Sequence, residues 1–154
     1  MTQASLVKIV EVTAADGTVP EPAWLARAES VHRQLRQQLP ADYAGRMRAI
    51  FAGGARMALA TAGERVLGVM VWRHLAKTYA DEVYVDDLVT DQAARSSGVG
   101  HTLLGWAAQR AAALGCDTLS LDSGTQRQQA HKFYFREGMV VTSFHFARSL
   151  ARRP

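Results

Sequence analysis

The residues Arg95, Ser96, Ser97, Gly98, Val99 and Gly100 have the types and the spacing of a site for a phosphate. They follow an apolar segment that is typical of a strand (residues 83–90) and precede an amphipathic segment that is typical of a helix (to about residue 114). The first N–H groups of a helix have no intrahelical partner, and the helix dipole favours negative charge there. Glycines let the backbone approach a phosphate closely, and an arginine adds a fixed positive charge. We therefore predict that this loop binds a ligand that carries a pyrophosphate.

Three kinds of phosphate loop compete for this stretch. A P-loop needs Lys and then Ser or Thr after its second glycine, but Gly100 is followed by His101 and Thr102. A dinucleotide-binding turn needs a third small residue where this chain has Leu103, which is too bulky for close packing of helix and strand. The third pattern, Arg/Gln-x-x-Gly-x-Gly/Ala, fits at every fixed position.

With this third pattern the sequence resembles the GNAT family of acetyl-coenzyme A-dependent N-acetyltransferases. A second motif of that family, Ala-x-x-Phe-Tyr-x-x-x-Gly-Phe, matches at Ala130, Phe133, Tyr134 and Gly138, with Met139 in place of the aromatic residue. The resemblance is most specific over residues 83–139, which it implies to be an acetyl-CoA-binding core. It implies acetyl-CoA as the cofactor and no metal.

The resemblance also implies roles for individual residues. Tyr134 would act as the general acid that protonates the departing thiolate of coenzyme A. The family usually has an asparagine shortly before Ala130, and here Ser123, Gln126 and Arg127 are candidates to replace it. The complete set of expected cofactor contacts comprises Leu88, Val89 and Thr90 on the pantetheine arm, the phosphate loop Arg95, Ser96, Ser97, Gly98, Val99 and Gly100 with His101, and Ser123, Arg127, Phe133 and Tyr134.

An amine that attacks a thioester must first lose a proton, so a base is expected. Strict alternation along residues 82–90 places Glu82 and Asp86 on one face, whereas Asp87 would point the opposite way and bond the backbone or a helix. By resemblance, Asp86 is the candidate base and Glu82 is the second candidate. His74 and His145 are read as structural histidines.

Hydrophobic periodicity predicts an alternation of helices and strands. Strands are expected at 5–12, 56–61, 65–75, 79–90, 118–122 and 139–147, and helices at 20–39, 42–51, 98–114 and 126–137. A helix between two strands requires a parallel pair, whereas the preceding hairpins are antiparallel. We predict an α/β fold in one domain, residues 1–154, with a mixed, mostly antiparallel sheet, helices on both faces and the order βααβββαβαβ. This is also the GNAT order.

Composition limits the class of protein. A chain of 154 residues with 48% hydrophobic residues is long enough for one domain with a real core. The net charge of +4 is dispersed, which argues against a nucleic-acid partner, and no apolar run has membrane-spanning length. Cys116 is the single cysteine, so we expect a reducing, cytoplasmic location and read Cys116 as a buried structural residue.

The leading hypothesis is acetyl transfer from acetyl-CoA to a primary amine of a small molecule or peptide, by direct attack in a ternary complex. The alternative is a non-catalytic sensor or regulatory module that binds acyl-CoA. The predicted helices within residues 20–52 would line the substrate side, where Trp24, Tyr43 and Arg46 are candidate contacts. A homodimer through the last predicted strand is a further expectation.

Overall fold

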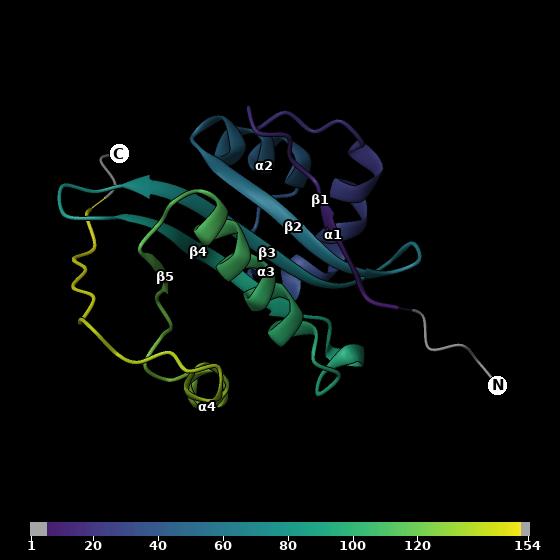
Figure 1. The fold of residues 1–154 in the computed structure, drawn as a ribbon. Coiled ribbons are helices and arrows are strands. Elements are labelled where there is room, and N and C mark those ends of the chain that lie inside the picture. The colour runs from purple at the N-terminus through teal and green to yellow at the C-terminus, as the bar shows by residue number, and fades with distance from the viewer. Residues whose placement is uncertain (1–5, 152–154) are drawn as a thin grey trace. The chain divides into compact units, whose positions relative to one another are not determined.

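The computed structural model describes residues 6–151. The chain divides into two compact units, of which the first ends at Leu121 and the second begins at Asp122. The first unit contains a five-stranded sheet whose strands lie in the order β1-β2-β3-β4-β5. Each pair of neighbouring strands from β1 through β4 is antiparallel, whereas β4 and β5 pair in parallel (Figure 1).

The helices and strands of the first unit occur in the predicted order. Their bounds are β1 Lys8–Glu11, α1 Pro22–Leu35, α2 Tyr43–Ala52, β2 Ala55–Ala62, β3 Arg65–Ala76, β4 Asp81–Thr90, the short 3-10 helix η1 Gln92–Ala94, α3 Val99–Ala113 and β5 Thr118–Leu121. The side chain of Asp42 caps α2 by accepting a hydrogen bond from the N–H of Gly45 at 2.9 Å. The mixed α/β fold class is confirmed.

Helix α1 ends earlier than residue 39, where the sequence predicted its end. The chain leaves helical geometry at Arg36, whose φ is −117° and ψ is 74°. The guanidinium of Arg33 then donates hydrogen bonds to the carbonyls of Leu39 and Pro40 at 2.6 and 2.7 Å. These bonds satisfy carbonyl groups of the connection to α2, so the segment before Pro40 is held without being helical.

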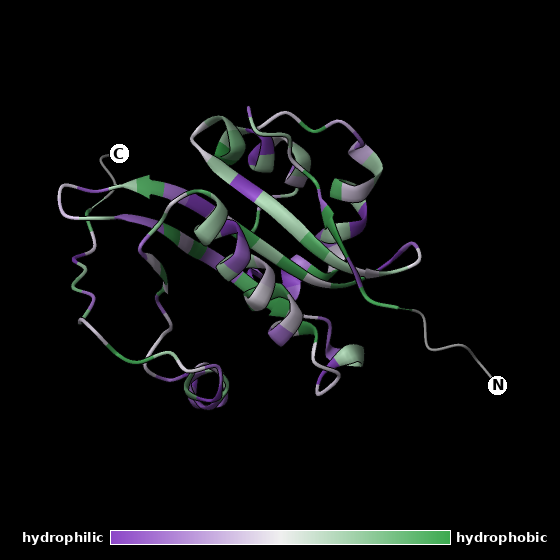
Figure 2. Ribbon diagram, in the orientation of Figure 1, coloured by the Kyte–Doolittle hydropathy of each residue, from purple (hydrophilic) through white to green (hydrophobic). Residues whose placement is uncertain are grey.

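Two apolar clusters cover the two faces of the sheet in the first unit. One contains Leu25, Met47 and Phe51 of α1 and α2, together with residues of the central strands. The other contains Leu103 and Ala107 of α3, packed on the opposite face. Strands β2 and β3 are mostly hydrophobic along their central stretches, as expected for strands covered on both faces (Figure 2).

The pairing of β3 with β4 contains an irregularity at Asp86. Val71 lies opposite Asp87 and Trp72 lies opposite Val85, so Asp86 is an extra residue on β4. A bulge of this kind reverses the alternation of side chains beyond it. Accordingly, Val85 belongs to the cluster beneath α3, whereas Val89 belongs to the cluster beneath α1 and α2.

Gly68 of β3 permits α3 to lie close to the sheet. A Cβ atom at this position would come within 2.7 Å of Val99 Cγ1 and 2.9 Å of Leu103 Cδ1. It would also lie 3.2 Å from the carbonyl oxygen of Val89. The absence of a side chain at Gly68 therefore fixes the start of α3 beside the end of β4.

The second unit, from residue 122 onward, contains helix α4, Gln128–Arg136. The final strand predicted at 139–147 was wrong, because residues 139–151 have no regular secondary structure. Within this unit no neighbouring strand pairs with the segment, and large side chains such as Phe144 and Phe146 are 82% and 91% exposed. A strand needs a pairing partner for its backbone groups, and apolar alternation alone does not supply one.

Helices in the described part of the chain are too short or too polar to cross a membrane.

Candidate active site

A pocket of about 410 Å³ opens in the first unit where α1, α2 and the connection between them face β3 and β4. Apolar and charged side chains share its wall, and both aspartates of β4 are among them. The lining residues are His32, Arg36, Gln38, Leu39, Pro40, Arg46, Met47, Ile50, Val71, Arg73, Asp86 and Asp87.

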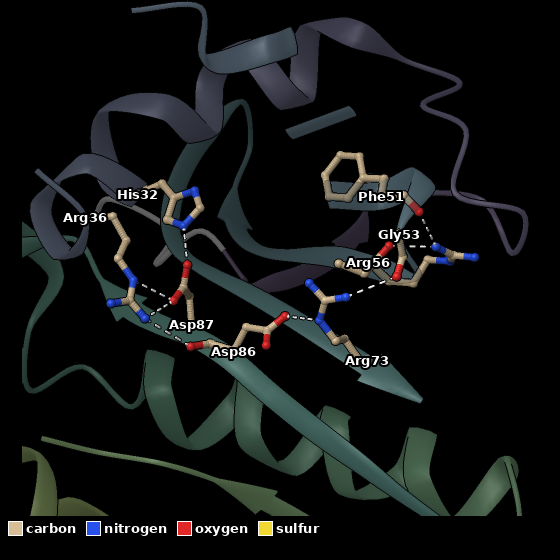
Figure 3. Close-up of polar contacts among 9 residues, drawn as sticks. His32, Arg36, Phe51, Gly53, Arg56, Arg73, Asp86 and Asp87 are labelled. Carbon is tan, nitrogen blue, oxygen red and sulfur yellow. Dashed lines mark hydrogen bonds and ion pairs between the residues drawn. The ribbon is translucent and has the colours of Figure 1, made fainter. Parts of the chain in front are cut away.

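Asp87 is the centre of a buried polar network. Its Oδ2 lies 2.7 Å from His32 Nε2, and its Oδ1 accepts a hydrogen bond from Arg36 Nε at 2.7 Å (Figure 3). Burial raises the pKa of Asp87, but the hydrogen bonds and charges of His32 and Arg36 outweigh burial, so its pKa lies below the usual value. Asp87 is therefore ionised at neutral pH, with both oxygens occupied.

His32 links this carboxylate to Tyr43. The imidazole is 1% exposed, and its Nδ1 lies 2.9 Å from the Tyr43 hydroxyl. Because ionised Asp87 can only accept a hydrogen bond, the N–H at Nε2 of His32 donates to it. Burial raises the pKa of Tyr43, so its hydroxyl stays protonated. Both ring nitrogens are thus used, and His32 positions Asp87 between α1 and β4.

Asp86 is placed differently from its neighbour. Its Oδ2 accepts a hydrogen bond from Arg73 Nε at 2.7 Å, and its main-chain carbonyl accepts one from Arg36 at 3.3 Å (Figure 3). Burial raises the pKa of Asp86, and Arg73 lowers it in part, so that the pKa lies above the usual value. A carboxylate with a raised pKa accepts a proton more readily than an ordinary one.

The predicted orientation of the two aspartates was wrong in one respect. Strict alternation placed Asp86 and Asp87 on opposite faces, whereas both line the pocket. The bulge at Asp86 is the reason, because it inserts one residue without a partner on β3. The expectation that Asp87 bonds a helix is confirmed by its contacts to His32 and Arg36 of the α1 region.

Glu82, the second candidate base, lies four residues earlier on β4 and is not among the lining residues. Its Oε2 accepts a hydrogen bond from Ser120 Oγ at 2.8 Å, and Lys77 contacts its other oxygen. Its role as a base stays a prediction.

The predicted phosphate loop forms a tight turn directly before α3. Gly98 is the residue before α3 and has φ of 80°, and Ser96 has φ of 63°, which is uncommon for a residue with a side chain. Val99, Gly100 and His101 then form the first turn of α3, where N–H groups have no helical acceptor. The sequence predicted the turn at Gly98, but nothing in it indicated the positive φ of Ser96.

Charge and exposure also suit an anion at this loop. Arg95 is exposed, and in the part of the chain that the structure describes it has no hydrogen bond or ion pair. The hydroxyl of Ser97 donates to the carbonyl of Ala94, which closes the turn after η1.

The outer edge of β4 fits an extended ligand. The parallel ladder with β5 ends at Val85 and Leu121, whereas pairing with β3 continues to Thr90. Within the first unit, the stretch that contains Leu88, Val89 and Thr90 is therefore paired on one side only. An extended chain that carries amide groups can hydrogen-bond to such an edge. These residues and the following loop thus have the donor types for a pantetheine arm and its pyrophosphate.

The remaining predicted site residues lie in the second unit. The rings of Phe133 and Tyr134 on α4 are 5.3 Å apart. Burial raises the pKa of Tyr134 and the charge of Arg127 lowers it in part, so the phenol stays protonated at neutral pH. The hydroxyl of Ser123 is buried without a hydrogen-bond partner among the described residues. The roles of these four residues stay predictions.

Sequence reasoning missed His32, Arg36 and Arg73 as members of the site. A signal for two of them was present: His32 continues the buried face of α1 after Ala28, and Arg36 follows four residues later. Arg73 gave no such signal, because its contact with Asp86 depends on strand register. Of the three candidate substrate contacts, Arg46 lines the pocket, Tyr43 is buried against His32, and Trp24 packs on the core.

Solved structures share the fold of this chain. An aminoglycoside N-acetyltransferase, AAC(6')-Iy, in complex with CoA aligns with a TM-score of 0.80 at 16% identity, covering 98% of this chain and 99% of that one. A transcriptional regulator from Bacillus halodurans aligns with a TM-score of 0.72 at 25% identity, covering 94% of this chain and all of the other.

Curated proteins match over a shorter region. The chain is 39% identical over 67 residues to an uncharacterized N-acetyltransferase, YhdJ, of Bacillus subtilis. It is 33% identical over 66 residues to an aminoalkylphosphonate N-acetyltransferase of Salmonella typhimurium. These matches cover 43% of this chain and less than half of either relative, 47% and 43% of their lengths.

A family model covers much more of the sequence. The model described as Acetyltransferase (GNAT) family matches residues 23–139, a region that includes the pocket, the phosphate loop and α4. Since this match spans well over half of the chain, the protein belongs to the GNAT acetyltransferase family.

Proposed function

We propose that this protein transfers the acetyl group of acetyl-CoA to a primary amine of a small molecule or peptide. Three features of the first unit together carry the proposal. They are an edge of β4 that lacks a partner strand beyond Val85, a glycine-bearing loop before α3, and a pocket with a carboxylate whose pKa lies above its usual value. Bound acetyl-CoA would supply the acetyl group as a thioester. The family match runs across both units, which supports treating residues 1–154 as one catalytic domain.

We assign the base to Asp86. It stands one residue beyond the end of the β4–β5 ladder, next to the edge that suits the pantetheine arm, and it faces the pocket. Asp86 would accept the proton of the substrate ammonium, after which the nitrogen forms a bond to the acetyl carbon while the bond from that carbon to sulfur breaks. Asp87 has both oxygens engaged by His32 and Arg36, so it holds the pocket wall in place.

Tyr134 is our proposed proton donor to the departing thiolate. Its raised pKa supports a protonated phenol at neutral pH, which a general acid requires. Two protons would leave the nitrogen: Asp86 would take the one that frees the amine and pass it to solvent, and the one lost as the amide forms would restore the phenol of Tyr134 after it has protonated the thiolate. No covalent intermediate on the protein is needed, in line with a direct attack.

We propose a primary amine as the acceptor of the acetyl group. The names of relatives and fold neighbours mention an aminoalkylphosphonate and aminoglycosides, which are all amines of small molecules. A cytoplasmic location and the absence of a nucleic-acid partner are part of the same proposal. A homodimer is proposed through residues 139–147, because this segment exposes Val140, Val141, Phe144 and Phe146.

The second candidate function is an acyl-CoA-binding regulator without catalysis. The fold neighbour from Bacillus halodurans that is titled a transcriptional regulator favours it. Both candidates require acetyl-CoA binding, but only the enzyme requires Asp86.

Two measurements on the natural chain and on Asp86→Asn distinguish the two functions. Isothermal titration with acetyl-CoA should give micromolar binding for the natural chain and for Asp86→Asn. Release of free thiol in the presence of an amine library should occur with the natural chain alone. Binding without thiol release for any amine would favour the regulator, and no binding to acetyl-CoA would overturn both.

A further inference from the structure

The wall of the pocket carries an excess of positive charge. It contains three arginines, Arg36, Arg46 and Arg73, and two aspartates. Arg36 pairs with Asp87, and Arg73 pairs with Asp86. Among these five charged side chains, one guanidinium is therefore left over.

That guanidinium belongs to Arg46. Among the residues that the structure describes, Arg46 has no hydrogen bond, ion pair or aromatic contact. It stands on the face of α2 that lines the pocket together with Met47 and Ile50, whereas Asp86 belongs to the strand wall. The pocket therefore presents a hydrogen-bond acceptor on the sheet, an apolar stretch, and an uncompensated cation on a helix.

This arrangement complements a molecule with two different ends. An ammonium group suits Asp86, a short apolar linker suits Met47 and Ile50, and an anion suits the planar fork of donors on Arg46. A substrate with several positive charges would meet three arginines at this wall and would be disfavoured.

We propose that the pocket selects primary amines that carry a carboxylate or phosphonate group, with Arg46 as the residue that binds this anion. The proposal rests on the proposed acetyl transfer and specifies its acceptor. Arg46 acts in specificity alone and takes no part in proton transfer.

The test uses four amines that differ only at the far end of a short chain. The anionic probes are 3-aminopropanoate and 2-aminoethylphosphonate, the neutral probe is 3-aminopropanamide, and the cationic probe is 1,3-diaminopropane. Thiol release from acetyl-CoA gives KM and kcat for each amine, and calorimetry of the chain loaded with coenzyme A gives Kd. The variants are Arg46→Gln and Arg46→Lys. The control is Arg48→Gln, because Arg48 is exposed on the same helix without a described partner and lies outside the pocket lining.

We expect the natural chain to prefer an anionic amine over the neutral and cationic ones. Arg46→Gln should raise KM and Kd for the anionic amine by about tenfold, the size of one charge-assisted pair, and should affect the neutral amine much less. Arg46→Lys should recover part of the loss, and Arg48→Gln should behave like the natural chain. The two anionic probes distinguish carboxylate from phosphonate.

Several results would overturn the proposal. Turnover of neutral or cationic amines as good as that of the anionic ones would refute the anion site and leave acetyl transfer intact. Equal effects of Arg46→Gln and Arg48→Gln would refute the role of Arg46. Conversely, binding of an anionic amine that depends on Arg46, without thiol release, would support the anion site and refute acetyl transfer.

Discussion

The two faces of the sheet in the first unit are built from different kinds of contact. The face beneath α3 is covered by an apolar cluster, and Gly68 allows the helix to pack directly against the strand. The face beneath α1 and α2 is apolar along β2, but at the pocket it carries Asp86 and Asp87 of β4 and Arg73 of β3, and side chains of the α1 region bond to Asp87. One face supports the predicted phosphate loop by close packing, and the other supports candidate chemistry by paired charges.

This difference shows how a single strand can serve both purposes. Up to Val85, β4 directs its apolar side chains toward α3, and beyond Asp86 it directs Asp87 and Val89 toward α1. The bulge therefore decides which side chains of β4 face α3 and which face α1. Point substitutions can perturb one face at a time.

The largest effect is expected at the polar face, from Asp86→Asn. Loss of the base should lower kcat by about 10²–10⁴-fold with little change in acetyl-CoA affinity. Because the pKa of Asp86 is raised, activity of the natural chain should increase with pH through that pKa, and the variant should lack this limb. Glu82→Gln is the matched control, and a larger loss of kcat for Glu82→Gln than for Asp86→Asn would move the base to Glu82.

At the packed face, Gly68→Ala should be the most damaging small change. The new methyl group would overlap Val99 and Leu103, and overpacking of this kind costs about 1–3 kcal/mol of unfolding free energy. It should also weaken acetyl-CoA binding, because Val99 starts α3. Gly105→Ala on α3 meets no atom within 4 Å and should stabilise the chain by up to about 1 kcal/mol. Chemical denaturation measures the change in unfolding free energy for both variants. Equal changes for Gly68→Ala and Gly105→Ala would contradict the close approach of α3 to β3 at Gly68.

Asp87→Asn tests whether the polar network contributes to stability. We expect a loss of about 1–2 kcal/mol at pH 7, since Asn cannot serve His32 and Arg36 as an ionised acceptor. The folded pKa of Asp87 lies below its unfolded value, so the carboxylate stabilises the fold above about pH 4 and loses this effect as pH falls through the folded pKa. The difference between variant and natural chain should thus shrink in acid, and a constant difference would argue against the ionised pair.

The smallest effect is expected from Arg95→Gln in the phosphate loop. Because Arg95 is exposed and has no described partner, melting temperature should not change. The Kd for acetyl-CoA should rise by about tenfold, or about 1.4 kcal/mol. Arg95→Lys should recover part of the affinity. An unchanged Kd for Arg95→Gln would contradict a role of the Arg95 side chain. Binding of the phosphates would then depend on the backbone of Gly98 and of the first turn of α3.

Sequence patterns located most elements because each depends on local properties. Periodicity in residues 20–39 and 98–114 predicted helices, which the structure has at Pro22–Leu35 and Val99–Ala113, and the glycines of the loop predicted the turn before the second helix. The last strand failed for the opposite reason. Residues 139–147 have apolar alternation, but strand formation also requires a pairing partner, which a pattern within one segment does not reveal.

By itself, the sequence determined the α/β class, which depends on residue types at local spacings, and it predicted a phosphate loop from the same kind of pattern and Asp86 as the candidate base from its family resemblance. Only the tertiary structure decided that Asp87 shares a pocket with Asp86, that His32 and Arg36 hold it, and that Arg73 pairs with Asp86. Those contacts join residues up to 55 positions apart and depend on one bulge in the register of β3 and β4. Register is set by the packing of both faces of the sheet at once, so no local pattern contains it.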